Sequence, residues 1–206
     1  MSDPRWQEAL DLLAAMLGAE RTRPDASIPH PDWLGTYADP ETGLSARIEA
    51  AAPGQLRLRF AHVPEVLALN PDRSAGRARS VLRPTSDGLV LERPQENMRS
   101  LLQPRPGAPR ADIAGRYRCA ELDAELHIED AGGLLHGAFA GLLGQGRMER
   151  LEPIGADLWA VPCPRALDHA PPGDWTLSIT RDSAGGVSGI TLGCWLARRL
   201  SYTQLR

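Results

Sequence analysis

The chain has 206 residues, a formal net charge of −3 and a pI of about 6.0, so it offers no electrostatic case for binding nucleic acid or an anionic membrane. Its hydrophobic share of 42% is ordinary for a globular protein, and no stretch approaches the roughly 18 apolar residues that mark a membrane-spanning helix. All 23 basic residues are arginine, which excludes any mechanism within this sequence that uses a lysine base or a lysine Schiff base.

Residues 3–17 have the pattern of a single α-helix. Asp3 suits the N-cap position and Pro4 the first helical position, and the apolar residues that follow recur at helical spacing. Residues 19–32 hold three prolines and few apolar side chains, which predicts an extended linker. We therefore assign residues 1–32 to an N-terminal helix and linker.

The next part of the chain, residues 33–105, predicts a series of short strands. Apolar residues alternate with polar ones over 44–48 and 56–60, with a Pro-Gly turn between them. Further strands are expected over 66–69, 78–83, 89–93 and 98–102. Their regular spacing favours a small antiparallel barrel or sandwich.

Residues 106–206 follow the same rhythm after a proline-rich linker over 104–111. Strands are expected near 126–128 and over 134–139, 148–151, 158–161, 175–181, 187–194 and 200–204, with a hairpin loop at 182–186. The sequence therefore predicts a second small antiparallel unit with a similar architecture.

A duplicated segment supports two related units. The stretch Ile113–Phe139 resembles the stretch Trp33–Phe60, and six identical residues in each copy are separated by a constant 80 positions. These residues are Gly35, Tyr37, Glu41, Ile48, Glu49 and Ala51, with Gly115, Tyr117, Glu121, Ile128, Glu129 and Ala131 as their counterparts. The period is longer than the roughly 20–50 residues of solenoid repeats, so it indicates a duplicated small domain.

The segment 162–173 interrupts the rhythm of strands. Its four prolines prevent it from forming a central strand, and its length is unusual for a hairpin connection. It brings Arg165, Asp168 and His169 together in one loop, which makes these three residues the candidate binding site.

The residues themselves show no catalytic set. A nucleophilic pair of Cys163 and His169 is conceivable, but neighbours in sequence need not face each other. Asp123 and Glu125 lie two residues apart, and an exposed strand face explains this pair better than acid–base chemistry does. The three cysteines lack metal-ligand spacing, so we expect reduced thiols, no metal and no cofactor. No signal peptide is visible, and a cytoplasmic protein is expected.

From Trp33 to Tyr202 the chain resembles the two C-terminal β-barrel domains, B and C, of bacterial D-stereospecific serine aminopeptidases. The matching segments occur in the family's order: Asp39-Pro-Glu-Thr-Gly-Leu44, Glu96-Asn-Met-Arg99, Gly115-Arg-Tyr117, Glu121-Leu-Asp-Ala124, Gly137-Ala-Phe139, Gly173-Asp-Trp175 and Gly193-Cys-Trp-Leu-Ala-Arg198. The resemblance implies two consecutive antiparallel eight-stranded, lipocalin-like β-barrels. It also implies that the helix at 3–17 corresponds to the last helix of a preceding catalytic domain.

The family belongs to the penicillin-recognising serine hydrolases, whose nucleophile and base come from a Ser-x-x-Lys motif. A sequence without lysine cannot contain this motif, so we expect no catalysis from this sequence on its own. The resemblance further implies that the loop 162–173 reaches over the catalytic cleft. Asp168 matches the family's acidic residue there, which would attract a substrate's ammonium group.

Three functional hypotheses follow. The chain is first predicted to be the non-catalytic accessory region of a D-aminopeptidase, which gates the access of substrates to a serine hydrolase catalytic domain on another chain. It would dock through its N-terminal helix, which can alternatively mediate self-association. The second hypothesis is a stand-alone barrel that binds a small ligand or a protein partner. The third is an independent enzyme that uses Cys163, and it ranks last.

Overall fold

The computed structural model describes residues 24–60, 64–76, 79–142, 144–162, 174–195 and 197–205. Within these ranges the protein is built from strands, with a single three-residue 3-10 helix. The helix expected over residues 3–17 lies outside the described residues, as do the three loop residues Arg165, Asp168 and His169. Across the ranges that are described, the chain forms no helix of the length and apolarity that crossing a membrane requires.

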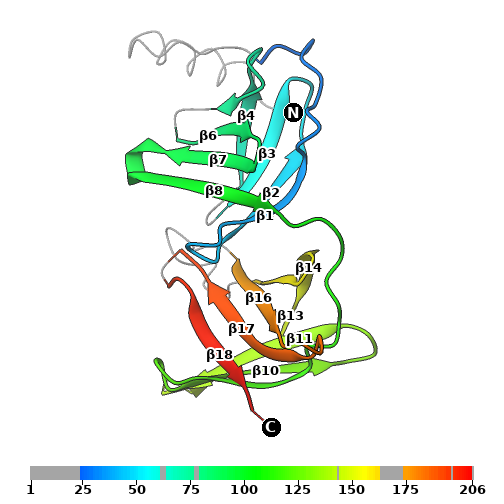
Figure 1. The fold of residues 1–206 in the computed structure, drawn as a ribbon, viewed down its shortest axis with the longest axis vertical. Coiled ribbons are helices and arrows are strands. Elements are labelled where there is room, and N and C mark those ends of the chain that lie inside the picture. Colours follow the sequence, from blue (N-terminus) through cyan, green and yellow to red (C-terminus); the bar gives the residue numbers. More distant parts are fainter. Residues whose placement is uncertain are drawn as a thin grey trace, which may run out of the picture.

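The first unit is a closed antiparallel barrel of eight strands that follow one another in sequence order (Figure 1). Its strands are β1 (Gly35–Ala38), β2 (Ser45–Ala50), β3 (Gln55–Phe60), β4 (Glu65–Leu69), β5 (Ala75–Gly76), β6 (Val81–Thr85), β7 (Gly88–Arg93) and β8 (Met98–Pro104), with the 3-10 helix η1 (Pro94–Glu96) between the last two. Pairing of β1 with β8 closes the barrel. The predicted closed eight-stranded barrel is confirmed for this unit.

The second unit is one strongly curved sheet of ten strands. Its strands are β9 (Gly115–Cys119), β10 (Ala124–Asp130), β11 (Leu135–Gly141), β12 (Gly144–Gln145), β13 (Glu149–Arg150), β14 (Glu152–Gly155), β15 (Leu158–Val161), β16 (Trp175–Arg181), β17 (Val187–Gly193) and β18 (Leu200–Gln204). β18 pairs with β9, so the first and last strands of the unit lie side by side in the middle of the sheet.

The expectation of a second closed eight-stranded barrel is wrong. Towards one edge of the sheet β11 pairs with β13, and at the other edge β15 pairs with β14. Only Leu151 separates β13 from β14 in the sequence. The segment 149–155 thus spans the two edges without a continuous ladder. Pro153 cannot donate to a ladder, and the register shifts between Pro153 and Gly155, which explains why pairing breaks into short pieces here.

The structure of the duplicated segment is repeated as well as its sequence. Gly35 pairs with Ile48 where β1 meets β2, and their counterparts Gly115 and Ile128 pair in the same way where β9 meets β10. Both glycines have strongly positive φ angles, 146° and 152°, which glycine adopts far more easily than other residues. The two units therefore begin with the same hairpin.

A buried tyrosine follows each of these glycines. The hydroxyl of Tyr37 donates a 2.8 Å hydrogen bond to the carbonyl oxygen of Trp33, and that of Tyr117 donates one of the same length to Ile113. Burial raises the pKa of Tyr117 to about 12, so this hydroxyl keeps its proton at physiological pH. Each tyrosine ties the entering chain to the start of its own unit.

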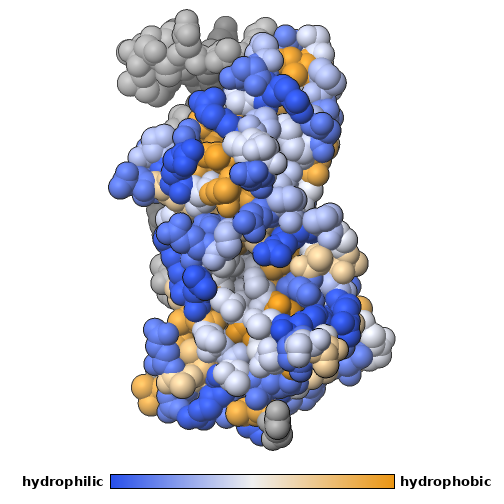
Figure 2. Space-filling model, viewed as in Figure 1, coloured by the Kyte–Doolittle hydropathy of each residue, from blue (hydrophilic) through white to orange (hydrophobic). Residues whose placement is uncertain are grey.

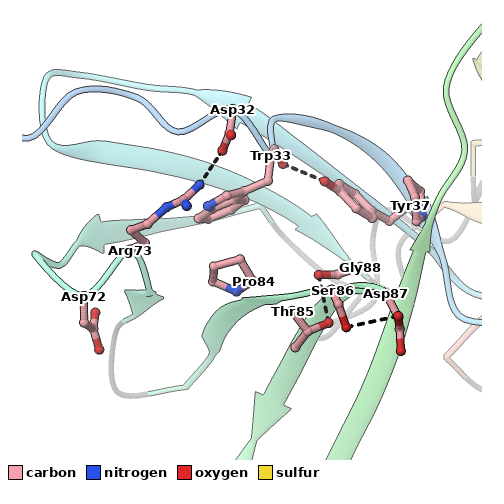
Figure 3. Close-up of a pocket in the computed structure, with 11 residues that line it drawn as sticks. Asp32, Trp33, Tyr37, Asp72, Arg73, Pro84, Thr85, Ser86, Asp87 and Gly88 are labelled. Carbon is pink, nitrogen blue, oxygen red and sulfur yellow. Dashed lines mark hydrogen bonds and ion pairs between the residues drawn. The ribbon is translucent and has the colours of Figure 1, made fainter.

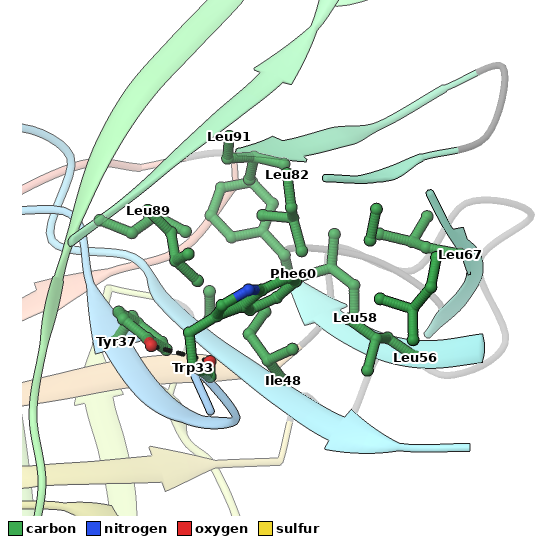
Figure 4. Close-up of a cluster of buried hydrophobic side chains, with 14 of the residues drawn as sticks. Trp33, Tyr37, Ile48, Leu56, Leu58, Phe60, Leu67, Leu82, Leu89 and Leu91 are labelled. Atoms are coloured by element: carbon green, nitrogen blue, oxygen red, sulfur yellow. Dashed lines mark hydrogen bonds between the residues drawn. The ribbon is translucent and has the colours of Figure 1, made fainter. Parts of the chain in front are cut away.

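The interior of each unit is filled by apolar side chains. In the first barrel, Trp33 lies across the interior among leucines and Phe60 (Figure 4). The second unit has a separate core that includes Tyr117, Trp159 and Tyr202. At roughly 25 cal/mol per Å² of apolar surface removed from water, these two cores are the main source of stability.

Candidate functional site

The two units meet at a junction that gathers several of the segments that carry the family resemblance. The β1–β2 turn, which contains the segment 39–44, lies against the end of β17. Arg93, which directly precedes the 3-10 helix, meets Trp195 of the β17–β18 connection at a second point. A third contact joins Arg47 of the first barrel to Asp174, which follows the loop 163–173. These contacts make the junction, shown between the two units in Figure 1, the candidate functional site.

The backbones of the two units touch at paired glycines. A Cβ atom placed on Gly193 would lie 2.4 Å from the carbonyl oxygen of Gly43, closer than real Cβ atoms approach any neighbour. The β1–β2 turn is rigid because the two carboxylate oxygens of Asp39 accept hydrogen bonds from the amide of Glu41 (2.9 Å) and the hydroxyl of Thr42 (2.7 Å). Glycine at position 193 therefore permits the close approach of a fixed turn.

A polar contact continues the junction along β2 and β16. The backbone amide of Ser45 donates a 3.0 Å hydrogen bond to the hydroxyl oxygen of Thr176, and the two side-chain oxygens lie 2.8 Å apart. Thr176 is buried, so this pairing satisfies a hydroxyl that would otherwise be costly to remove from water. A small apolar cluster of Ala38 with Ile154, Leu158 and Ala160 adds dry contact nearby.

A buried arginine lies at the end of the first barrel that faces the second unit. Arg93 has an exposed fraction of 0% and contacts both oxygens of Glu96 at 2.6 Å and one oxygen of Glu65 at 2.9 Å. Burial alone lowers the pKa of Arg93, but the hydrogen bonds and charges of Glu96 and Glu65 outweigh burial and raise it. The guanidinium is thus held as a cation inside a cage of two carboxylates.

Trp195 of the second unit contacts this cage. Its ring centroid lies 5.9 Å from the Cζ atom of Arg93 and 5.5 Å from that of Arg198, within the range of cation–π attraction. The indole also packs against the core of the first barrel. The β17–β18 connection therefore anchors the second unit on the first.

The root of the loop 163–173 is held by the same junction. Val161 and Trp175 pair where β15 ends and β16 begins, so they close the base of the loop. Next to them, Arg47 of the first barrel lies 3.5 Å from Asp174 and 3.5 Å from Glu152. The first barrel thus contributes a cation to the base of a loop that belongs to the second unit.

We expect the pKa of Asp174 to make stability depend on pH. Desolvation raises this pKa above 3.8, Arg47 opposes the change, and Glu152 adds to it. The folded protein therefore holds the proton more tightly than the unfolded chain does. The favourable contribution of protonated Asp174 is fully present below the unfolded pKa and is lost as pH rises through the folded pKa.

The measurement is the unfolding free energy of Asp174→Asn against the unchanged chain at several pH values. The variant should be the more stable at pH 7, and its relative advantage should shrink as pH falls towards 3.8. Asp182→Asn, in the hairpin loop away from the junction, gives a comparison that removes a carboxylate elsewhere. A constant difference for Asp174→Asn across this range would contradict the assignment.

The pairs that the sequence suggested elsewhere have structural explanations. Arg116 lies 2.6 Å from Glu125, and Arg118 forms an ion pair with Asp123, so this strand face carries paired surface charges. Cys119 and Cys194 are buried free thiols. Cys163, which the lowest-ranked hypothesis uses as a nucleophile, lies outside the described residues. No group of three His, Cys, Asp or Glu side chains suited to a metal ion occurs in the part of the chain that the structure describes.

A depression of about 770 Å³ lies at the end of the first barrel where β1 begins and β8 ends (Figure 3). Several of its polar groups pair with one another: Arg73 lies 2.6 Å from Asp32, and the Ser86 hydroxyl lies 3.1 Å from Asp87. Trp33 separates the depression from the barrel core. One lining group is unpaired, because Trp33 Nε1 is buried and has no hydrogen-bond partner among the described residues.

The fold and the junction define an all-β protein of two related units, joined through a rigid turn, a caged arginine and the base of a long loop. A family model for domain B of D-aminopeptidase matches residues 26–203. The chain therefore belongs to the D-aminopeptidase domain B family, as the sequence resemblance predicted.

Two similar proteins are each named D-aminopeptidase. The D-aminopeptidase of Gluconobacter oxydans is 48% identical over 203 residues, and that of Brucella ovis is 39% identical over 197 residues. These matches cover 94% and 96% of this chain, respectively. The chain spans only 38% of the length of either relative.

Proposed function

We propose that this chain is the non-catalytic accessory region of a D-aminopeptidase, an enzyme that releases N-terminal D-amino acids from peptides and amides. The observation that carries the proposal is the partial match to proteins named D-aminopeptidase. This chain corresponds to 38% of the length of each, and it contains no lysine. The serine and lysine of a Ser-x-x-Lys site would then lie in the part of the enzyme outside this sequence, on the same polypeptide or on another.

The loop 162–173 is the proposed substrate-selecting element. Asp168 would attract the free ammonium group of a substrate, and Arg165 and His169 would flank it. Val161 pairs with Trp175 at the base of this loop, and Asp174 lies 3.5 Å from Arg47. These contacts support the proposal, since a loop that selects substrates needs a fixed base. Junction contacts between the two units would thereby determine where the loop is presented.

The alternative, a stand-alone lipocalin-like barrel that binds a small ligand, has less support. Fifteen buried side chains occupy the interior of the first barrel, which leaves its lumen filled, as in other small barrels. The depression beside Trp33 lies outside that interior, and two of its charged side chains, Arg73 and Asp32, pair with each other. Cys163, on which an independent enzyme would depend, lies outside the described residues.

The test of substrate selection uses a chimaera in which this chain replaces the matching region of the Gluconobacter oxydans D-aminopeptidase. Asp168→Asn should raise the KM for a D-amino acid amide about tenfold, equivalent to ~1.4 kcal/mol of lost attraction for the ammonium group. Steady-state kinetics on the purified chimaera provides the measurement.

Asp87→Asn in the same chimaera is the matched control, because Asp87 is an exposed carboxylate of the first barrel away from the loop. Its KM should stay within a factor of two of the unchanged chimaera, since an exposed charge has little effect at a distance. Equal KM values for Asp168→Asn and Asp87→Asn would remove the selecting role from the loop.

A further inference from the structure

The depression at one end of the first barrel has the size and the place of a small-molecule site. Its volume of about 770 Å³ falls within the range of roughly 300–1,000 Å³ for ligand pockets, which often occupy the mouth of a β-barrel. Its lining comes from the entry to β1, the β4–β5 turn, the β6–β7 turn and the end of β8 (Figure 3). The face in Figure 2 mixes hydrophilic residues with small apolar groups, so exposed apolar surface alone marks no site there.

One hydrogen-bond donor of this lining is unpaired. Trp33 is 8% exposed, and its Nε1 is buried without a hydrogen-bond partner among the described residues. Buried donors are nearly always paired, because the cost of removing the N–H group from water is otherwise not offset. Figure 3 shows the indole nitrogen on the side of the ring near Arg73, which also lines the depression. Trp33 thus offers an N–H group to an acceptor on a ligand.

The rest of the barrel holds this donor in place. Trp33 packs against the core of the first unit, and its carbonyl oxygen accepts the 2.8 Å hydrogen bond from the hydroxyl of Tyr37. A side chain that is already fixed loses little conformational entropy when a ligand binds. The indole therefore presents its N–H group in one orientation.

The residue before Trp33 supplies an acceptor. Oδ1 of Asp32 lies 2.6 Å from Arg73, whereas Oδ2 accepts no hydrogen bond from the residues that the structure describes. The side chains of Asp32 and Arg73 are 81% and 63% exposed, so their ion pair contributes little and can open for a ligand. In Figure 3 the carboxylate of Asp32 lies beside the indole of Trp33. Adjacent residues thus bring an acceptor and a donor to the same space.

The charges of the lining favour a cation. The depression is lined by three carboxylates and one guanidinium, that of Arg73. Arg83, at 3.8 Å from Asp72, offsets one of these carboxylates only in part. An ammonium group is attracted to such a lining and an anion is repelled. A plain amine would still leave the Trp33 donor unpaired, so the matching ligand carries an acceptor next to its ammonium group.

We propose that the depression binds small α-amino carbonyl compounds with a net positive charge, such as amino acid amides and the N-terminal residues of short peptides. The ammonium group donates to Oδ2 of Asp32, and the neighbouring carbonyl oxygen accepts the N–H of Trp33. The rest of the depression takes the ligand's side chain. This site goes beyond the proposed function and does not depend on it, because it is built from the first barrel alone.

An NMR titration of the isotopically labelled chain with D-phenylalaninamide tests the contact with Trp33. The chain has five tryptophans and therefore gives five indole N–H signals. One of these signals should shift during the titration, and Trp33→Phe should remove that same signal. A titration that moves no indole signal would overturn the proposal, as would movement of a signal that persists in Trp33→Phe.

Two truncated probes test the two halves of the ligand. N-acetyl-D-phenylalaninamide lacks the charge, and phenethylamine lacks the carboxamide. Each should bind at least about tenfold more weakly than D-phenylalaninamide, because each loses one of the two polar contacts. Equal affinity for phenethylamine would contradict the contact with Trp33, and equal affinity for the acetylated amide would contradict the contact with Asp32.

Substitutions assign these losses to residues. Trp33→Phe should weaken D-phenylalaninamide about tenfold and leave phenethylamine unchanged, since that probe has no carbonyl oxygen. Asp32→Asn should weaken both amines, and it decides the matter if Trp33→Phe does not fold. Trp159→Phe is the matched control, because Trp159 Nε1 is also buried and unpaired but belongs to the core of the second unit. An equal loss of affinity in Trp159→Phe would overturn the site.

The titrations use the isolated chain, so they are separate from the test of the accessory role. An active chimaera together with an isolated chain that binds no D-phenylalaninamide would overturn the site and leave the proposed function standing. Binding with the expected losses, together with an inactive chimaera, would support the site and count against the accessory role.

Discussion

Replacing Arg93 with alanine should lower the free energy of unfolding by about 3 kcal/mol, because it leaves two carboxylates without their shared cation. Glu65 and Glu96 have exposed side-chain fractions of 18% and 21%, so partial hydration places the effect at the lower end of the range for broken buried ion pairs. Loss of the stacking surface for Trp195 adds to the cost. Urea denaturation followed by tryptophan fluorescence provides the measurement.

Two further variants separate charge from packing. Arg93→Met retains most of the side-chain volume, so a loss nearly as large as that of Arg93→Ala would assign the effect to the unpaired carboxylates. Arg99→Ala is the surface control, because Arg99 is 70% exposed and lies 3.5 Å from Glu92. It should cost less than about 1 kcal/mol. A loss below this value for Arg93→Ala would refute the cage as a main stabilising element of the junction.

Substituting Gly193 with alanine should separate the two units. The new methyl group would meet the carbonyl oxygen of Gly43 at 2.4 Å, and the rigid Asp39 turn cannot move away without losing its hydrogen bonds. We expect a loss of about 2 kcal/mol of unfolding free energy, typical of overpacking. Small-angle X-ray scattering should show an increased radius of gyration.

Gly146 provides the matched control for this steric argument. The nearest atom to a Cβ at Gly146 is the carbonyl oxygen of Phe139 at 3.5 Å, an ordinary contact. Gly146→Ala should therefore leave the radius of gyration unchanged. An unchanged radius and unfolding curve for Gly193→Ala would show that the units are not held together at the glycine contact.

The strands were predictable because their side chains alternate between core and solvent. Leu56, Leu58 and Phe60 point inwards on β3 and are buried, as their spacing indicates. The hairpin at 182–186 was predictable from its turn residues, and its ends are joined by a hydrogen bond from the amide of Asp182 to Gly186. Local periodicity thus accounts for most of the elements.

The junction was not predictable from local patterns, because its contacts join distant residues. Arg93 and Glu65 are 28 positions apart, and Ser45 and Thr176 are separated by 131. An arginine at the end of a strand is usually a solvated residue, so nothing in its neighbourhood distinguished Arg93. The segments around Glu96 and Gly193, which carry the family resemblance, were the only hint in the sequence that these regions matter. That they lie close together in space could be seen only in the folded structure.

The open edge of the second sheet was also missed. The duplication predicted two similar small units, and the family resemblance implied that both are eight-stranded barrels. The shared hairpin at Gly35 and Gly115 supports a common start. The segment around Pro153 departs from the first unit and interrupts the ladder. Sequence similarity confined to the first hairpin therefore could not specify how the second unit would close.

The accessory role itself is tested most directly by the turnover of the chimaera on a D-amino acid amide. The reference is the Gluconobacter oxydans D-aminopeptidase with its matching region deleted. If this chain is the accessory region of such an enzyme, the chimaera should hydrolyse the amide at a rate near that of the intact relative and well above that of the deleted form. A folded chimaera no faster than the deleted enzyme would contradict that role.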